Sequence, residues 1–256
     1  HGPAYDFDLA GFAAGIDVYN TANDIIGFYV GIGHLTSSVQ GVSGNDGGKV
    51  EMDAYALGGY WTHYGQGDWY TDVVLQGALY RDIDATSVNM DGGHSLRTEG
   101  SSFTASLEGG YPFALGGGYA IVPLAQLIYQ RMSVEDGSDQ FALIDFADID
   151  ELYGRVGGRL TRKWAMAENR VLTTWGEAAV WRQFGDDAKT TFSTLQDTNQ
   201  VTMTTDLGGA WAQFRLGLSG QVTPNINLFA NGDYNVGLND ASDHSLGGSL
   251  GIGFQW

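Results

Sequence analysis

Apolar and polar residues alternate with a period of two along most of the chain. Between Phe103 and Phe113 every odd position is apolar or glycine, whereas the even positions from Thr104 to Gly110 are polar or glycine. Successive side chains of a β-strand point to opposite faces, so this period predicts strands with one apolar and one polar face. We count about eleven such segments, each longer than the five or six residues typical of soluble proteins. They lie at 6–20, 25–37, 49–64, 69–83, 103–113, 119–132, 151–163, 171–184, 211–222, 226–236 and 246–256.

The connections between these segments alternate strictly between short and long. The short ones lie at 20–24, 65–68, 115–118, 164–169 and 223–225. The long ones, which are polar and acidic, lie at 38–48, 84–96, 133–150, 185–201 and 237–245. Outer-membrane barrels have short periplasmic turns and longer external loops, and aromatic residues beside the turns, such as Trp61 and Trp69, fit their interfacial girdle. The order of the connections therefore predicts an all-β protein, a transmembrane antiparallel up-and-down β-barrel.

Composition excludes several classes of protein. The 30 acidic and 12 basic residues give a net charge of −18, so we expect no nucleic-acid partner. The chain has no cysteine, which excludes disulfide frameworks and thiolate metal sites. The uncharged stretch 109–130 would suffice for a membrane helix, but Pro112, Pro123 and the glycines at 116–118 would break it. Neither the histidine spacing nor the acidic stretch 136–151 fits a metal site, so we expect no metal and no cofactor.

Six groups of residues, in order along nearly the whole chain, carry a resemblance to a known family. They are Tyr5–Leu9 with Gly15–Asp17, Asp53–Tyr55 with Tyr60–Tyr64, Ala105–Phe113, Pro123–Gln130, Gly154–Leu160 and Gly251–Trp256. Together they resemble the C-terminal translocator domain of classical autotransporters, in which a helix threads a barrel of twelve strands. The resemblance implies one outer-membrane barrel domain over residues 1–256. It begins at the family's second strand, so we expect the pore helix and the first strand to be absent from this chain, in agreement with the odd count of strands.

The same resemblance implies a function in type V secretion. We expect a translocator in the outer membrane of a Gram-negative bacterium, which anchors its own N-terminal passenger and exports it to the cell surface. The expected partners are outer-membrane lipid and lipopolysaccharide, the barrel-assembly machinery, and a passenger or linker segment in the pore. The alternative is a passive porin or an adhesin-type outer-membrane barrel with functional external loops.

The polar faces of the strands should point into the lumen. The residues that we expect to line it are Asp72, Glu108, Gln126, Arg155, Arg159, Glu177, Gln213, Arg215 and Asp233. Acids and arginines on neighbouring strands would pair across a narrow wet channel, and they would also line a hydrophilic path for a passenger segment. Some relatives cleave their passenger inside the barrel, but the linker that this requires is not visible here. We therefore expect no enzyme activity and assign no catalytic residue; the pair Asp243 and His244 reads as part of a solvated loop.

The last eight residues alternate between polar or glycine residues and hydrophobic ones, and they end on an aromatic residue. They resemble the signal by which outer-membrane barrels are recognised by the barrel-assembly machinery, which would pair with this strand by β-augmentation. The residues assigned to this signal are Ser249, Gly251, Phe254 and Trp256.

Overall fold

The protein is almost entirely composed of β-strands in a computed structural model that describes residues 5–40, 46–87, 94–139, 141–167, 170–185, 188–205, 209–223, 225–238 and 243–254. The strands are β1 (Tyr5–Asn20), β2 (Asp24–Gln40), β3 (Asp46–Tyr64), β4 (Tyr70–Ser87), β5 (His94–Gly110), β6 (Phe113–Gly116), β7 (Tyr119–Val134), β8 (Gly137–Ser138), β9 (Ala142–Phe146), β10 (Ile149–Ala165), β11 (Val171–Gly185), β12 (Ala188–Thr194), β13 (Val201–Thr205), β14 (Ala210–Thr223), β15 (Ile226–Gly237) and β16 (His244–Phe254). Over these ranges, no helix has the length and apolar character that a bilayer crossing requires.

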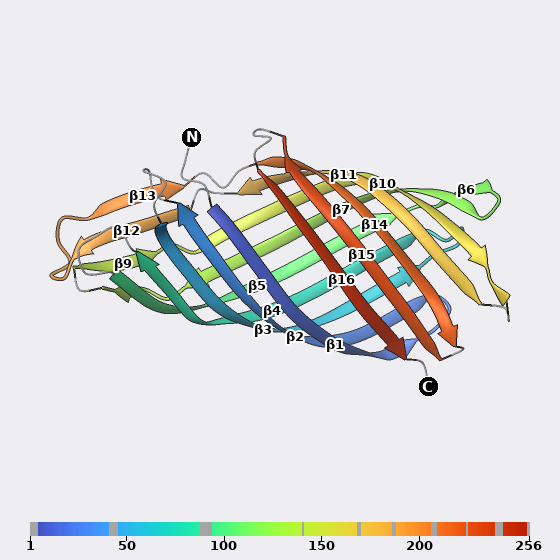
Figure 1. Ribbon diagram of the computed structural model, residues 1–256, viewed down its shortest axis with the longest axis horizontal. Helices are drawn as coiled ribbons and strands as arrows, with labels where there is room; N and C mark the ends of the chain where they lie inside the picture. The colour runs from blue at the N-terminus through green and yellow to red at the C-terminus, as the bar shows by residue number, and fades with distance from the viewer. Residues whose placement is uncertain are drawn as a thin grey trace.

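Twelve strands form one large antiparallel sheet. Its path runs β1-β2-β3-β4-β5-β7-β10-β11-β14-β15-β16, and β6 pairs only with β7. The path strands are 11 to 19 residues long, which is enough to cross a membrane at a tilt. The sheet curls round so that β1 and β16 return to the same side (Figure 1), and they run parallel because each path strand is antiparallel to the next. Among the described pairings none joins β1 to β16. The eleven predicted segments correspond to these path strands.

Burial is inverted relative to a soluble protein. The apolar residues that are buried in the described ranges are few: Ala78, Val122, Leu124, Ile144, Ala179 and Trp181. The buried residues also include Glu151, Arg155 and Glu177, whereas Leu246 and Leu250 are 84% and 86% exposed. Charged residues are rarely buried in a soluble domain, while a membrane barrel places its apolar band outside and its polar side chains inside. The alternation read from the sequence therefore separates a lipid-facing wall from a polar lumen.

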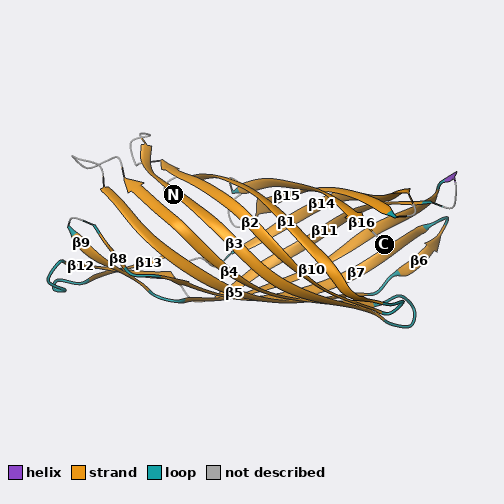
Figure 2. Cartoon of the chain, turned by 90° about the horizontal axis from the view of Figure 1, so that it is seen from below, coloured by secondary structure: helices purple, strands orange, loops and turns teal. Residues whose placement is uncertain are grey.

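The two ends of the barrel differ, as the order of the connections predicts. At the end that carries the long connections, here the loop end, β13, β12, β9 and β8 form a second sheet of four strands that extends beyond the barrel (Figure 2). The sequence predicts long polar connections at 133–150 and 185–201, and the structure adds that these connections contain β8, β9 and β12. The β9 and β12 segments consist largely of apolar and β-branched residues, with Asp145 as their one acid, and Ile144 and Ser193 are buried in the paired segments.

The opposite end, here the turn end, carries the short connections. One of them is extended by the hairpin of β6 and β7, which turns through Gly116, Gly117 and Gly118 with φ of 86°, 61° and 82°. These left-handed conformations favour glycine because it has no Cβ. The predicted strand 103–113 ends earlier, at Gly110, because Pro112 has no N–H to continue the ladder.

Candidate functional site

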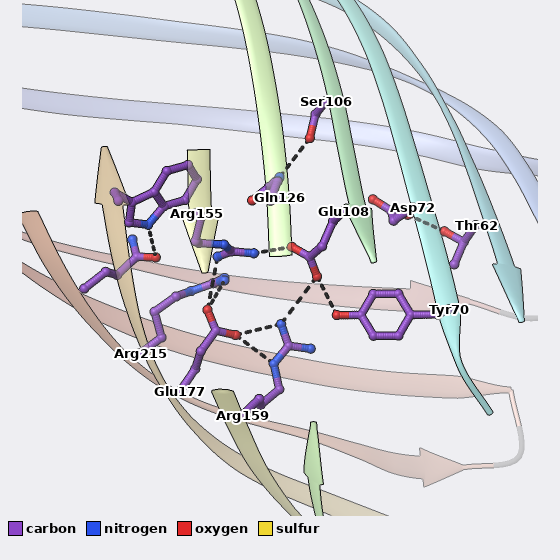
Figure 3. Close-up of polar contacts among 12 residues, drawn as sticks. Thr62, Tyr70, Asp72, Ser106, Glu108, Gln126, Arg155, Arg159, Glu177 and Arg215 are labelled. Carbon is purple, nitrogen blue, oxygen red and sulfur yellow. Dashed lines mark hydrogen bonds and ion pairs between the residues drawn. The ribbon is translucent and has the colours of Figure 1, made fainter. Parts of the chain in front are cut away.

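Five charged side chains from four strands converge on the inner face of the sheet (Figure 3). They are Glu108 on β5, Arg155 and Arg159 on β10, Glu177 on β11 and Arg215 on β14, and we refer to them as the lumen cluster. The strand register accounts for their meeting, because Glu177 lies opposite Arg159 on one side and opposite Arg215 on the other. All five belong to the set expected to line the lumen.

Glu177 is at the centre of the lumen cluster. It accepts hydrogen bonds from Arg155 Nη1 at 3.1 Å and from Arg159 Nε at 2.8 Å, and Arg215 Nη1 lies 3.6 Å from its Oε1. Arg155 also donates to Glu108, whose other oxygen lies 3.9 Å from Arg159 Nη2. The side chains of Glu177 and Arg155 are 0% and 3% exposed, whereas those of Arg159 and Arg215 are 25% and 27% exposed. Three arginines against two glutamates leave the lumen cluster with a net charge of +1 in a strongly acidic chain.

Aromatic rings fix the guanidinium groups of the lumen cluster. The Arg155 guanidinium lies 4.9 Å from the ring centroid of Trp181, while those of Arg159 and Arg215 lie 5.2 Å and 5.4 Å from that of Trp175. Such cation–π contacts hold an arginine in place and are stronger where water is excluded. The sequence reasoning missed these tryptophans because it assigned aromatic residues to the interfacial girdle. The signal that could have found them is parity, since both lie an even number of residues from Glu177 and so share its face.

The other residues expected to line the lumen lie beside the lumen cluster without joining it. Gln126 donates to Ser106 Oγ at 2.8 Å, and Gln213 accepts from Trp181 Nε1 at 3.0 Å. Thr62 donates to Asp72, and Asn235 donates to Asp233 at 3.0 Å. Tyr70, which is not in the expected set, donates to Glu108 of the lumen cluster at 2.6 Å. The inner wall therefore carries one dense ionic centre with separate polar pairs around it.

Close packing of aromatic rings over glycines stiffens another part of the inner wall. The Tyr29 ring lies across Gly58, where an added Cβ would come within 2.3 Å of it, and Tyr29 Oη donates to Gln76 Oε1 at 2.7 Å. The Tyr60 ring lies across Gly27 in the same way, again at 2.3 Å from an added Cβ. Only glycine allows a ring to lie this close to the backbone of the next strand.

Outside the lumen, a carboxylate, an imidazole and a hydroxyl are aligned on the outer wall. Asp53 Oδ1 lies 2.7 Å from His34 Nδ1, and His34 Nε2 lies 3.4 Å from Thr36 Oγ1. The His34 and Asp53 side chains are 57% and 41% exposed, so water competes for them, and the hydroxyl contact is long for activation of a nucleophile. His244, the histidine considered from the sequence, lies 6.4 Å from the Tyr234 ring centroid. In the part of the chain that the structure describes, no group of three or more potential ligands could hold a metal ion.

Three of the residues assigned to the assembly signal, Ser249, Gly251 and Phe254, belong to β16, which pairs with β15. Ser249 Oγ accepts from Asn231 Nδ2 at 2.8 Å, and Gly251 lies under the Phe229 ring. Phe254 is the last residue of β16 and is 59% exposed, whereas Trp256 lies outside the described residues.

Comparisons with known proteins agree with this geometry. The model of the autotransporter beta-domain family matches residues 1–233. The adhesin BmaC autotransporter of Brucella suis biovar 1 is 28% identical to the chain and covers 99% of it, and the pertactin autotransporter of Bordetella bronchiseptica is 27% identical and covers 92%. The chain spans only 8% and 25% of these two relatives.

Solved structures show the same fold. The β-domain of the Bordetella autotransporter BrkA matches with a TM-score of 0.72 at 20% identity, covering 99% of this chain and 93% of that one. The translocator domain of NalP from Neisseria meningitidis matches with a TM-score of 0.76 at 13% identity, covering 98% and 82%. The chain therefore belongs to the autotransporter beta-domain family, and it is a β-barrel of the Gram-negative outer membrane.

Proposed function

We propose that the chain is the membrane-anchored translocator of a longer autotransporter, and that it carries a passenger segment through or alongside its lumen to the cell surface. One observation carries this proposal: the chain belongs to the autotransporter beta-domain family, and its barrel has a polar lumen and an apolar outer wall. A segment that crosses a bilayer needs polar partners for its backbone, and a barrel lumen supplies them.

The side chains of the lumen cluster have two roles: some hold the barrel wall together, and others can contact a segment in the lumen. Arg155 and Glu177 are buried and ion-paired with each other and with neighbouring side chains of the wall, so their role is to hold the wall. Arg159 and Arg215 are about a quarter exposed, and their remaining N–H groups are available to a segment in the lumen. The wall is thus rigid behind the arginines that a passenger or linker would contact.

The test is an export assay. The chain is placed behind a signal peptide, a reporter passenger and a linker, and expressed in a Gram-negative host; surface exposure is measured by protease accessibility on intact cells. We expect the passenger at the surface, and a several-fold lower rate of its appearance for the double variant R159Q/R215Q. The matched control is R182Q, which removes an arginine that lies over the Phe184 ring.

The outcomes of this assay separate the alternatives. A folded, membrane-inserted barrel that leaves the reporter in the periplasm would overturn the proposal. A wide and stable single-channel conductance that a linked passenger segment does not block would favour the porin alternative instead.

We further propose that the barrel-assembly machinery recognises β16. This strand ends in the aromatic residue Phe254, and its second edge carries no described pairing, so a partner strand could add there. The contact with lipopolysaccharide that we expect from the sequence stays a prediction.

A further inference from the structure

The outer wall is hollowed at the turn end, where Met166, Ala167 and Arg170, between β10 and β11, lie beside β14 and β15. The groove encloses about 350 Å³, and its apolar lining includes Met166, Leu172, Leu218, Gly220, Val222 and Leu228. We refer to it as the periplasmic-rim groove, because short connections mark the periplasmic end of such barrels.

The periplasmic-rim groove opens toward lipid rather than toward the lumen. Leu218 and Gly220 lie an odd number of residues from Arg215 on β14, so they belong to the opposite face of the strand. The register places Leu172 of β11 and Leu228 of β15 on either side of Gly220. Gly220 leaves the floor of the groove open, since an added Cβ there would come within 3.1 Å of Leu172 Cδ1.

Arg170 lies at the rim of the groove. Its Nε donates to the carbonyl oxygen of Ala167 at 3.2 Å, and its Nη1 donates to the carbonyl oxygen of Val222 at 3.0 Å. The guanidinium is therefore held between the β10–β11 turn and the end of β14, directly beside the apolar lining. An apolar slot with a fixed cation at its edge matches the two parts of a phospholipid.

A second arginine lies near the groove on the same wall. Arg162 donates to Tyr119 Oη at 2.7 Å, and its guanidinium lies 3.4 Å from the ring centroid of Trp164. Trp164 is paired with Leu172, which lines the groove, so this stack lies one strand from the groove. Tryptophan, tyrosine and arginine together are typical of the depth at which lipid headgroups lie.

The local charge favours an anion. The segment 162–170 contains Arg162, Lys163 and Arg170 against the single acid Glu168, in a chain that has 12 cations and 30 acids. Lys163 alternates to the inner face, which leaves two arginines for the lipid-facing side. Guanidinium groups bind phosphate oxygens through paired N–H donors, and basic residues near a membrane surface favour anionic lipids.

We propose that the periplasmic-rim groove binds an anionic phospholipid of the periplasmic leaflet, with an acyl chain in the apolar slot and the phosphate at the arginine-bearing rim. The proposal depends on the barrel lying in the outer membrane and is independent of passenger export. It commits to a lipid rather than to a free anion because the lining of the groove is apolar apart from Arg170 and Gln221, and because Leu172, Leu218 and Leu228 belong to the lipid-facing side of their strands.

Native mass spectrometry of the refolded full chain in a neutral detergent tests this site. Phosphatidylglycerol and phosphatidylcholine of equal chain length are offered separately, and the retained lipid is counted. We expect one retained phosphatidylglycerol and markedly less phosphatidylcholine. R162Q and R170Q should each lower phosphatidylglycerol retention about fivefold, the factor expected for one cation near an anionic surface.

Two further variants make the test specific. G220L fills the slot without a change of charge, so it should lower the retention of both lipids. R182Q removes an arginine that lies over the Phe184 ring near the other end of β11. This variant should leave lipid retention unchanged. Each variant is first checked for folding by its heat-modifiable migration in gels.

Three results would overturn the proposal. They are equal retention of both lipids by the unaltered chain, an equal loss in R182Q and R170Q, and full displacement of phosphatidylglycerol by inorganic phosphate. The last result would assign the arginines to a free-anion site instead.

Discussion

Replacement of Glu177 by glutamine would show how strongly the lumen cluster stabilises the barrel. The Glu177 carboxylate is fully buried, accepts hydrogen bonds from Arg155 and Arg159, and lies 3.6 Å from Arg215. Glutamine is nearly isosteric but neutral, so it leaves Glu108 alone among three arginines and raises the net charge of the cluster from +1 to +2.

The size of the effect follows from burial. Two unit charges about 4 Å apart attract by about 4 kcal/mol at an effective dielectric constant of about 20, and desolvation offsets much of this in the intact cluster. Removal of one partner from a buried pair typically costs about 3–5 kcal/mol, because the remaining charge is buried without compensation. We therefore expect E177Q to lower the free energy of unfolding by about 3–5 kcal/mol. The assay is guanidinium unfolding of the chain in lipid vesicles, followed by tryptophan fluorescence.

A double-mutant cycle separates charge from packing. R215Q removes one of the three arginines and returns the cluster of E177Q to +1, so the double variant should lose less stability than the sum of the single variants. The control is E51Q, which removes one exposed ion pair with Lys49 and should change stability little. A loss below about 1 kcal/mol for E177Q, or one equal to that of E51Q, would refute a structural role for the lumen cluster.

Two other substitutions test the packing and assembly of the barrel. G58A places a methyl group where the Tyr29 ring now lies, so we expect the free energy of unfolding to fall by about 1–3 kcal/mol in the same assay. The control is G31A on the neighbouring strand, whose added Cβ would lie 3.6 Å from its nearest atom and should be tolerated. Equal losses in the two variants would contradict the reasoning. F254A should slow assembly, measured as accumulation of unfolded, protease-sensitive chain, whereas L250A on the same strand should not, and equal rates for both would count against recognition of the terminal aromatic residue.

The position of each strand, and the face to which each of its side chains points, followed from the local alternation of apolar and polar residues. The alternation around Glu108 and Arg155 predicts which side chains share a face, because strand geometry makes every second residue point the same way. The short and long connections predicted the up-and-down order and the two unlike ends of the barrel, since a barrel separates its turns and loops across the membrane. The alternation did not predict the strands of the small external sheet. β9 and β12 are short and lie in acidic stretches of the sequence, and they pair only with each other and with β8 and β13.

The sequence by itself determined the strands and their apolar and polar faces, and it predicted a set of residues for the inner face, because these depend on a period of two within each strand. Only the tertiary structure decided which of those residues meet. Glu177 lies between Arg159 and Arg215 because of the register of β10, β11 and β14. The groove beside Arg170 forms because residues between β10 and β11 pack against β14 and β15. Register and packing arise from contacts between segments distant in the chain, and no local pattern contains them.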